Sequence, residues 1–179
     1  MKSVMISIQP KWCGLIANRK KTVEVRKTKP ELETPFKCYI YCTKSKKEFL
    51  QSHSNIKFYC EDRDFIGGHG VGWYRRLNGS VIGEFVCSDI TWGNGLNFVV
   101  KEDAETTLQG TCLTKDDIYK YIGLERGMSR SDKKTEFYRW HISDLVIYDK
   151  PKELSEFGLE RPPQSWCYVN EENNEEPKK

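Results

Sequence analysis

The sequence contains no hydrophobic run of the roughly 20 residues that a membrane-spanning helix needs. Its opening residues, MKSVMISIQP, also lack the apolar segment of a signal peptide. The seven cysteines form an odd-numbered set without the close, even spacing of a disulfide framework, which favours a reducing compartment. We therefore expect a protein that stays in the cytoplasm and has no membrane partner.

Motifs for metal and cofactor binding are also missing. No Cys-x-x-Cys pair occurs, and Cys38 and Cys42 fall on the apolar face of a predicted strand, which favours core thiols over zinc ligands although His53 and Cys60 follow. The Gly-rich stretch at 67–72 lacks the Gly-Lys-Ser/Thr ending of a phosphate-binding loop. The three histidines are scattered and form no catalytic motif. The sequence therefore predicts no metal and no cofactor.

The composition is that of a folded protein. A chain of 179 residues, 37% hydrophobic and 12% aromatic, can build a hydrophobic core. The net charge of +3 is too small for a general nucleic-acid coat, so attraction to an anion requires a local cluster. One cluster exists, in which six basic residues surround the single acid Glu24: Arg19, Lys20, Lys21, Arg26, Lys27 and Lys29. This cluster is either an anion-binding surface or a solvated face of the fold.

Hydrophobic periodicity predicts several short strands and two helices. Strand-like alternation occurs at 1–8, 36–43, 80–88, 136–142 and 145–148. Gly83, inside one of these segments, indicates a bulge or the close approach of another backbone. Helical spacing occurs at 11–19 and at 114–122, where Thr114 is a suitable N-cap and Gly123 a stop signal.

The order of these elements shows no regular β-α-β alternation, which predicts an α+β fold built as a small β-barrel with flanking helices. The region 44–78 lacks clear periodicity and is predicted to be an insertion or loop, with a short helix around 47–51. The residues 170–179 are rich in acids and are predicted to form a disordered tail. We therefore expect one domain over residues 1–169.

The segment from Thr22 to Arg26 is the most informative part of the sequence. Alternation sends Val23 and Val25 to one face of a strand and Thr22, Glu24 and Arg26 to the other. With the valines in the core, the three polar side chains share an exposed surface. A ligand site and a purely structural pairing are both compatible with this pattern.

The structural alternative is an exposed ion pair between Glu24 and Arg26, which contributes less than about 1 kcal/mol. Lys21 adds a further constraint. Strict alternation places it on the valine side, so it joins the polar face only if the strand begins at Thr22.

Four short motifs occupy the first third of the chain: Ser7-Ile8-Gln9-Pro10, Trp12, Leu15-Ile16 and Lys21-Thr22-Val23-Glu24-Val25-Arg26. In this order they resemble the opening signature of ASCH domains, a branch of the PUA-like superfamily. Later strands resemble those of the same family at 38–43, 82–86 and 138–142. The ending from Pro162 to Tyr168 resembles a subgroup found among phage and prophage proteins.

The resemblance implies a PUA-like barrel with a cleft between its sheet and its first helix, lined by Lys21, Glu24 and Arg26. Families with this fold bind RNA or modified bases. Arg26 offers a planar donor fork, and Glu24 accepts hydrogen bonds from amino groups. Stacking candidates are Trp12, Tyr39, Tyr41, Tyr138, Trp140 and Trp166. The predicted binding residues are Trp12, Lys21, Thr22, Glu24, Arg26 and Tyr41, with RNA or a nucleotide as partner and DNA as the alternative.

Two other functions stay open. Small bacterial acetylcytidine amidohydrolases of the PUA-like superfamily resemble the 21–26 segment and use a Lys, a Thr three positions later and a distant carboxylate. Here Lys21 matches the Lys, but Glu24 replaces the Thr, so these two would be the catalytic residues of such an enzyme. The distant acid would be Asp116, Asp117 or Glu125. The third function is a protein-interaction adaptor that binds no nucleic acid.

Overall fold

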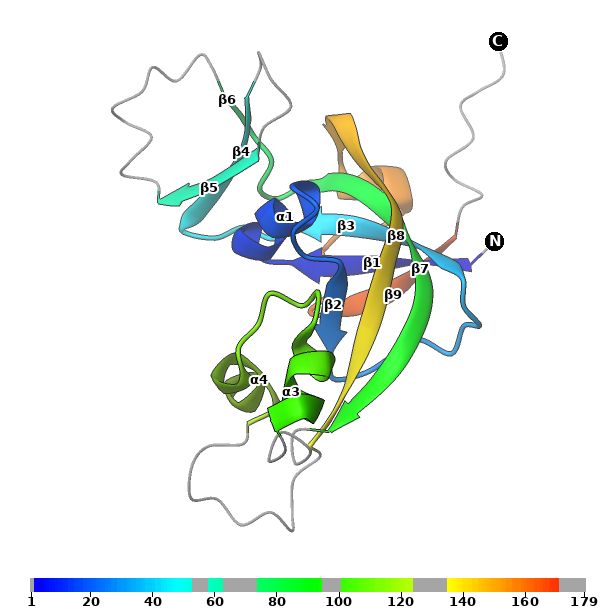
Figure 1. Cartoon of the computed structure of the whole chain (residues 1–179). Helices are drawn as coiled ribbons and strands as arrows, with labels where there is room; N and C mark the ends of the chain where they lie inside the picture. Colours follow the sequence, from blue (N-terminus) through cyan, green and yellow to red (C-terminus); the bar gives the residue numbers. More distant parts are fainter. Residues whose placement is uncertain (1, 53–57, 63–73, 95–100, 124–134, 171–179) are drawn as a thin grey trace.

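A six-stranded sheet, a separate three-stranded sheet and short helices make up the computed structural model, which describes residues 2–52, 58–62, 74–94, 101–123 and 135–170 (Figure 1). The larger sheet has the order β2-β8-β7-β3-β1-β9. Its strands are β1 (Lys2–Ile8), β2 (Val23–Arg26), β3 (Phe36–Cys42), β7 (Val81–Asn94), β8 (Glu136–Lys152) and β9 (Trp166–Asn170). Only β1 and β3 pair in parallel; every other neighbour in this sheet is antiparallel.

The helices are α1 (Pro10–Ala17), α3 (Lys101–Leu108), α4 (Lys115–Ile122) and the short 3-10 helix η3 (Leu154–Phe157). The α4 prediction is confirmed at both ends. The Thr114 side chain accepts a hydrogen bond from the Asp117 amide, and Gly123 ends the helix in the left-handed conformation. Helix α1 also forms as predicted but ends earlier, at Ala17. No helix in the described ranges has the length and hydrophobicity required to span a membrane.

The predicted α+β class is confirmed, but backbone pairing does not close the larger sheet into the predicted barrel. Within the described residues, β2 and β9 are its outer strands and do not pair with each other. Side chains cross this gap instead. The Trp166 indole donates to the Thr28 hydroxyl at 3.0 Å, and the Glu31 amide donates to the Tyr168 hydroxyl at 2.8 Å. We call this gap between β2 and the β1–β9 pair the seam.

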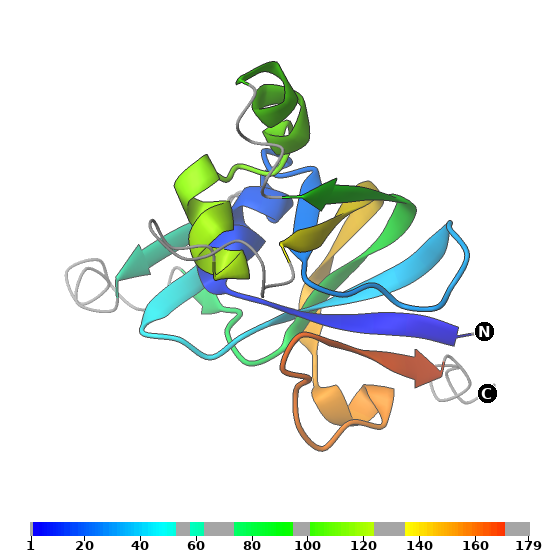
Figure 2. The same ribbon diagram turned by 90° about the horizontal axis from the view of Figure 1, so that it is seen from below.

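Both faces of the larger sheet carry clusters of buried side chains. One face carries the main core, which includes Phe36, Cys38, Ile40 and Cys42 of β3, as the alternation predicts. The other face of the same strand is buried as well. There, Tyr39 and Tyr41 lie in a second cluster, together with Met5, Val81, Phe157 and Val169. Helix η3 covers this second face, on the side of the sheet opposite α4 (Figure 2).

The two closing strands predicted at 136–142 and 145–148 are a single strand, β8. Between the two predicted segments, at Ser143 and Asp144, the strand has only an irregularity, where Asp144 has a positive φ of 46° and the pairing with β7 shifts register. Strand β7 is long enough to continue pairing on both sides of this point, so the local turn signal does not end the strand.

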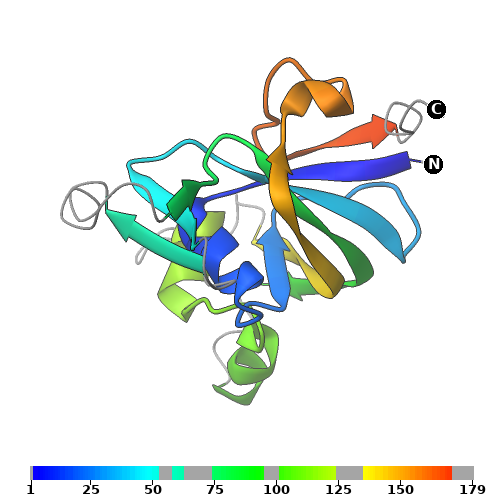
Figure 3. The ribbon, with the colours of Figure 1, turned by 90° about the horizontal axis from the view of Figure 1, so that it is seen from above.

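The smaller sheet has the order β5-β4-β6, formed by β4 (Lys47–Ser52), β5 (Phe58–Asp62) and β6 (Tyr74–Arg76). The helix predicted around 47–51 is therefore wrong. Pairing with strands on both sides fixes this segment as β4, because tertiary partners override a weak local pattern. Viewed from above, this sheet lies beside α1 and away from β9 (Figure 3).

Several predictions lie outside the described residues. They concern His53, the Gly-rich stretch at 67–72, Glu125 and the tail beyond Asn170, which itself ends β9. The single domain over 1–169 remains a prediction.

Gly83 provides a test of the close approach between β7 and β8. A Cβ atom at this position would collide with the Val146 carbonyl oxygen and lie 3.0 Å from the Ile147 Cα. Because both obstacles are backbone, we expect Gly83→Ala to lower the free energy of unfolding by about 2–3 kcal/mol in urea denaturation. Val146→Ala removes an exposed side chain from the facing strand, and its effect should stay below about 0.5 kcal/mol. Equal effects of the two changes would show that the backbones can separate without cost.

Candidate functional site

A cavity of about 500 Å³ opens at the seam, within the range of roughly 300–1,000 Å³ typical of small-molecule sites. Four parts of the chain meet there: the end of β1 with α1, the β2 region, helix α4, and the segment before β9. The residues used below are among its walls: Ser7, Gln9, Trp12, Lys21, Glu24, Arg26, Thr43, Asp117, Lys120, Tyr121, Gln164 and Ser165.

Glu24 forms the centre of a row of three charged side chains. Its Oε1 lies 3.0 Å from the Arg26 Nη2, and its Oε2 lies 3.4 Å from the Lys21 Nζ. The exposed fractions of Lys21, Glu24 and Arg26 are 2%, 6% and 8%. The expected exposed surface is therefore wrong: these charges are buried. We call Lys21, Glu24 and Arg26 the ionic row.

Lys21 joins this row because β2 begins only at Val23, so strand alternation does not determine where the lysine points. Its Nζ donates to the Val23 carbonyl at 2.8 Å and to the Thr111 carbonyl at 2.6 Å. With Glu24, these acceptors use all three N–H donors of the ammonium group. Lys21 is therefore held firmly, between the start of β2 and the loop before α4.

Arg26 connects β2 to the opposite side of the seam. Its Nη2 donates to the Ser7 carbonyl of β1 at 2.6 Å, and its Nη1 donates to the Ser165 hydroxyl at 3.4 Å. The Nε–H is buried and has no hydrogen-bond partner among the described residues. A buried donor without a partner is costly, so a ligand group in the cavity would gain by accepting from it.

Glu24 also retains binding capacity. An ionised carboxylate can accept about four hydrogen bonds, whereas among the described residues Glu24 is paired only with Lys21 and Arg26. The cavity wall thus offers free acceptor positions on Glu24 beside a free donor on Arg26. This pair suits a ligand that presents donor and acceptor groups next to each other.

Two aromatic side chains line the same cavity. The half-buried Trp12 has the Lys21 Nζ 5.3 Å and the Lys11 Nζ 4.4 Å from its ring centre. Tyr121, on α4, is 38% exposed, and the Lys27 Nζ lies 5.2 Å from its ring centre. Burial raises the pKa of Tyr121 above its usual value, opposed by the nearby Arg26 and assisted by Glu24.

Sequence reasoning identified Trp12 but missed Tyr121 as a site residue. Tyr121 was recognised only as part of a helix. No local signal links it to the 21–26 segment, because the contact depends on how α4 packs against β2.

Of the three distant acids considered, Asp117 lines the cavity. Its carboxylate accepts hydrogen bonds from the Thr114 amide at 2.9 Å and from the Thr114 hydroxyl at 2.7 Å, and these bonds lower its pKa. Asp117 therefore caps α4. Asp116 is exposed and is not part of the cavity wall.

The structure does not bring Thr22 and Tyr41 to the site. Thr22 is exposed, and its side chain points towards Gly110, where it is the nearest obstacle to an added Cβ. Tyr41 is buried in the second cluster, on the other face of the larger sheet from Cys42. The other aromatic candidates, Tyr39, Tyr138, Trp140 and Trp166, are likewise absent from the cavity wall.

The cysteines considered as metal ligands have a different place. Cys38 and Cys42 are free thiols in the main core. Burial is the main reason that the pKa of Cys38 is well above its usual value. This is the environment of an unreactive core thiol.

The fold and the cavity together describe a small α+β protein with a charged cleft. No family model and no curated protein sequence matches the chain. The crystal structure of the ASCH protein from Zymomonas mobilis resembles it with a TM-score of 0.61 and 18% identity, over 96% of this chain and 90% of the other. A tyrosine-to-phenylalanine mutant of that protein gives a TM-score of 0.61, and a serine-to-alanine mutant 0.60, each at 18% identity. At this identity the likeness shows the fold alone: the chain folds like that ASCH protein.

The ionic row can be tested by removing its central charge. We expect Glu24→Gln to lower the free energy of unfolding by about 3 kcal/mol, because Lys21 and Arg26 would remain buried without a counter-charge. The measurement is urea denaturation followed by tryptophan fluorescence.

A matched control removes a charge from the more exposed Lys37–Glu84 pair, whose atoms are 3.5 Å apart. Lys37→Gln should cost less than about 1 kcal/mol, because solvent screens this pair. If the two variants had the same free energy of unfolding, the ionic row would contribute no more to stability than a surface ion pair, and the prediction would be wrong.

Proposed function

We propose that the cleft binds one nucleotide of single-stranded RNA, or a free modified nucleotide, with single-stranded DNA as the weaker alternative. The observation that supports this most directly is the ionic row on the cavity wall, with free acceptor positions on Glu24 next to the unpartnered Nε–H of Arg26.

The energetics favour a functional reason for this row. Removing charges from water costs several kcal/mol for each ion, and their mutual attraction often does no more than balance that cost. Apolar residues of similar volume would stabilise the seam at least as well. Buried charges that line a cavity are instead typical of binding and catalytic sites.

Nucleobases fit the arrangement chemically. Their edges carry hydrogen-bond donors and acceptors side by side, and carboxylate and guanidinium groups are among the side chains that read them. Their flat faces stack on aromatic rings, such as those of Trp12 and Tyr121 at this cavity. Lys120, at the same wall, adds a positive charge for a phosphate group.

The geometry favours binding over amide hydrolysis. A catalytic lysine has to accept a proton from the substrate or donate one to it. The Lys21 ammonium group is instead directed at three oxygen atoms of the protein. Glu24 stands at the place of the expected hydroxyl nucleophile, and a carboxylate paired with two cations does not supply that hydroxyl.

The proposed setting is the cytoplasm, and the free thiols of the buried cysteines support it. The resemblance of the Pro162–Tyr168 ending to phage and prophage proteins supports an origin in such a genome.

The stacking role can be tested at Tyr121, which belongs to none of the core clusters. A base stacked on an aromatic ring contributes about 1–3 kcal/mol, so Tyr121→Ala should weaken the binding of nucleoside monophosphates or short RNA about 5- to 150-fold. Tyr121→Phe retains the ring and should bind within about twofold of the original protein. Both are measured by tryptophan fluorescence titration.

Trp92→Ala is the control for nonspecific stacking, because Trp92 is 51% exposed and lies outside the cleft. It should leave the affinity unchanged. An equal loss with Trp92→Ala and Tyr121→Ala would place the binding surface elsewhere and contradict the proposal.

The distinction from an enzyme can be tested with acetylcytidine. Since Lys21 is fully engaged, we expect the compound to be recovered intact after overnight incubation and chromatography. The appearance of cytidine, lost in Glu24→Ala, would replace the binding proposal with amide hydrolysis.

A further inference from the structure

Five lysines are exposed in two segments that begin at the rim of the cleft: Lys11, Lys20, Lys44, Lys46 and Lys47. The segments 9–21 and 43–47 contain no acidic residue. We call these lysines the basic band. None of them belongs to the ionic row, and the proposed nucleotide site does not use them.

The two segments diverge from a common point. The Thr43 amide donates to the Ile8 carbonyl at 2.9 Å, and both residues line the cleft. From Ile8 the chain passes through Gln9, another wall residue, into α1, whereas from Thr43 it continues into β4. The basic band therefore begins where the cleft wall ends.

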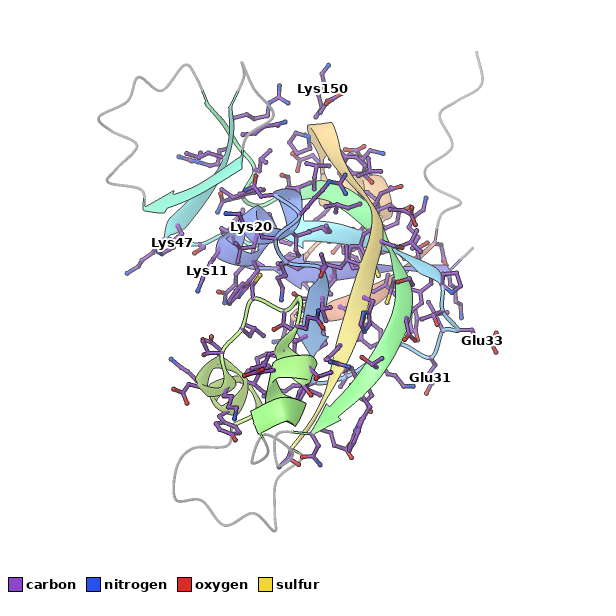
Figure 4. All side chains as sticks on the ribbon, in the orientation of Figure 1. Lys11, Lys20, Glu31, Glu33, Lys47 and Lys150 are labelled. Atoms are coloured by element: carbon purple, nitrogen blue, oxygen red, sulfur yellow. The ribbon has the colours of Figure 1, made fainter. Side chains whose placement is uncertain are left out.

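The two branches also remain close to each other, because α1 packs against β4 and β5 of the smaller sheet. In Figure 4, Lys11, Lys20 and Lys47 lie on the side of α1 and this sheet, whereas Glu31 and Glu33 lie on the opposite side of the molecule. Among the labelled side chains, the three lysines and the two glutamates thus lie on opposite sides of the cleft region.

The position of Lys11 connects the band to the cleft. Its Nζ lies 4.4 Å from the centre of the Trp12 ring, which lines the cleft. A base stacked on this ring would bring its own phosphate group near Lys11.

We infer that a single-stranded RNA held in the cleft extends over the basic band, with its phosphates against Lys11, Lys20, Lys44, Lys46 and Lys47, and not towards Glu31 and Glu33. This rests on the proposed function and adds the direction and length of the bound strand. The contacts are ionic and independent of base sequence, so they contribute affinity without selecting the base.

The test compares short RNA with a single nucleotide. An RNA of about 12 nucleotides should bind more tightly than a nucleoside monophosphate, with a steeper dependence of affinity on salt. In the double variant Lys46→Gln/Lys47→Gln, the slope of log affinity against log salt for this RNA should fall by about 1.4, since each phosphate contact contributes about 0.7 for single strands. The affinity for the monophosphate should not change.

Lys2→Gln/Lys150→Gln is the matched control, because it removes the same charge from exposed lysines outside both segments; Lys150 is labelled in Figure 4. Its salt slope should equal that of the unmodified protein. The inference is overturned if both double variants lower the slope alike, since net charge alone would then be responsible. A loss of monophosphate affinity in Lys46→Gln/Lys47→Gln would also overturn it, because these lysines would then act on the cleft itself.

The two proposals can fail separately. If the monophosphate and the RNA bind with the same affinity and the same salt slope, the cleft holds a nucleotide and only the extension over the basic band is wrong. If neither binds, both proposals are wrong.

Discussion

The Arg26 guanidinium joins the two edges of the larger sheet. It pairs with Glu24 on β2, donates to the Ser7 carbonyl on β1, and reaches the Ser165 hydroxyl just before β9. Among the strands that the structure describes, pairing leaves this side of the sheet open, so a charged side chain makes the connection that backbone hydrogen bonds would make in a closed barrel. Because the contacts are made by side chains, the seam keeps a hollow beside it, and this hollow is the cleft.

The same atoms therefore hold the seam together and form the wall of the proposed binding site. Lys21 is fully engaged, and it fixes Glu24 from one side while Arg26 fixes it from the other. Among the described residues of this row, two kinds of group can still bind a ligand: acceptor positions on the Glu24 carboxylate and the Nε–H of the Arg26 guanidinium. Such a rigid, partly satisfied network presents a ligand with groups that are already oriented, so little ordering cost is left for binding.

Local patterns predicted much of the scaffold. Alternation in β1 and β3 identified their core residues, and the Thr114 and Gly123 signals identified both ends of α4, because these features depend on neighbours in sequence. The predictions failed where distant partners decide. The 47–51 segment is a strand because β5 and β6 pair with it, and β8 passes through its Ser-Asp pair because β7 continues beside it. Tyr41 is buried because a second layer, including Phe157, covers that face of the sheet.

For the site, the sequence by itself determined which charges occur together: Glu24 and Arg26 share a face of β2 because strand side chains alternate. It also placed Trp12 near them through the short connection from α1. Only the tertiary structure decided that these charges are buried, that Lys21 turns into the row, and that Tyr121 forms part of the cleft wall. The physical reason is that burial depends on what covers a strand, and here the cover is α4 and the segment before β9, which are about 90 and 140 residues away in the chain.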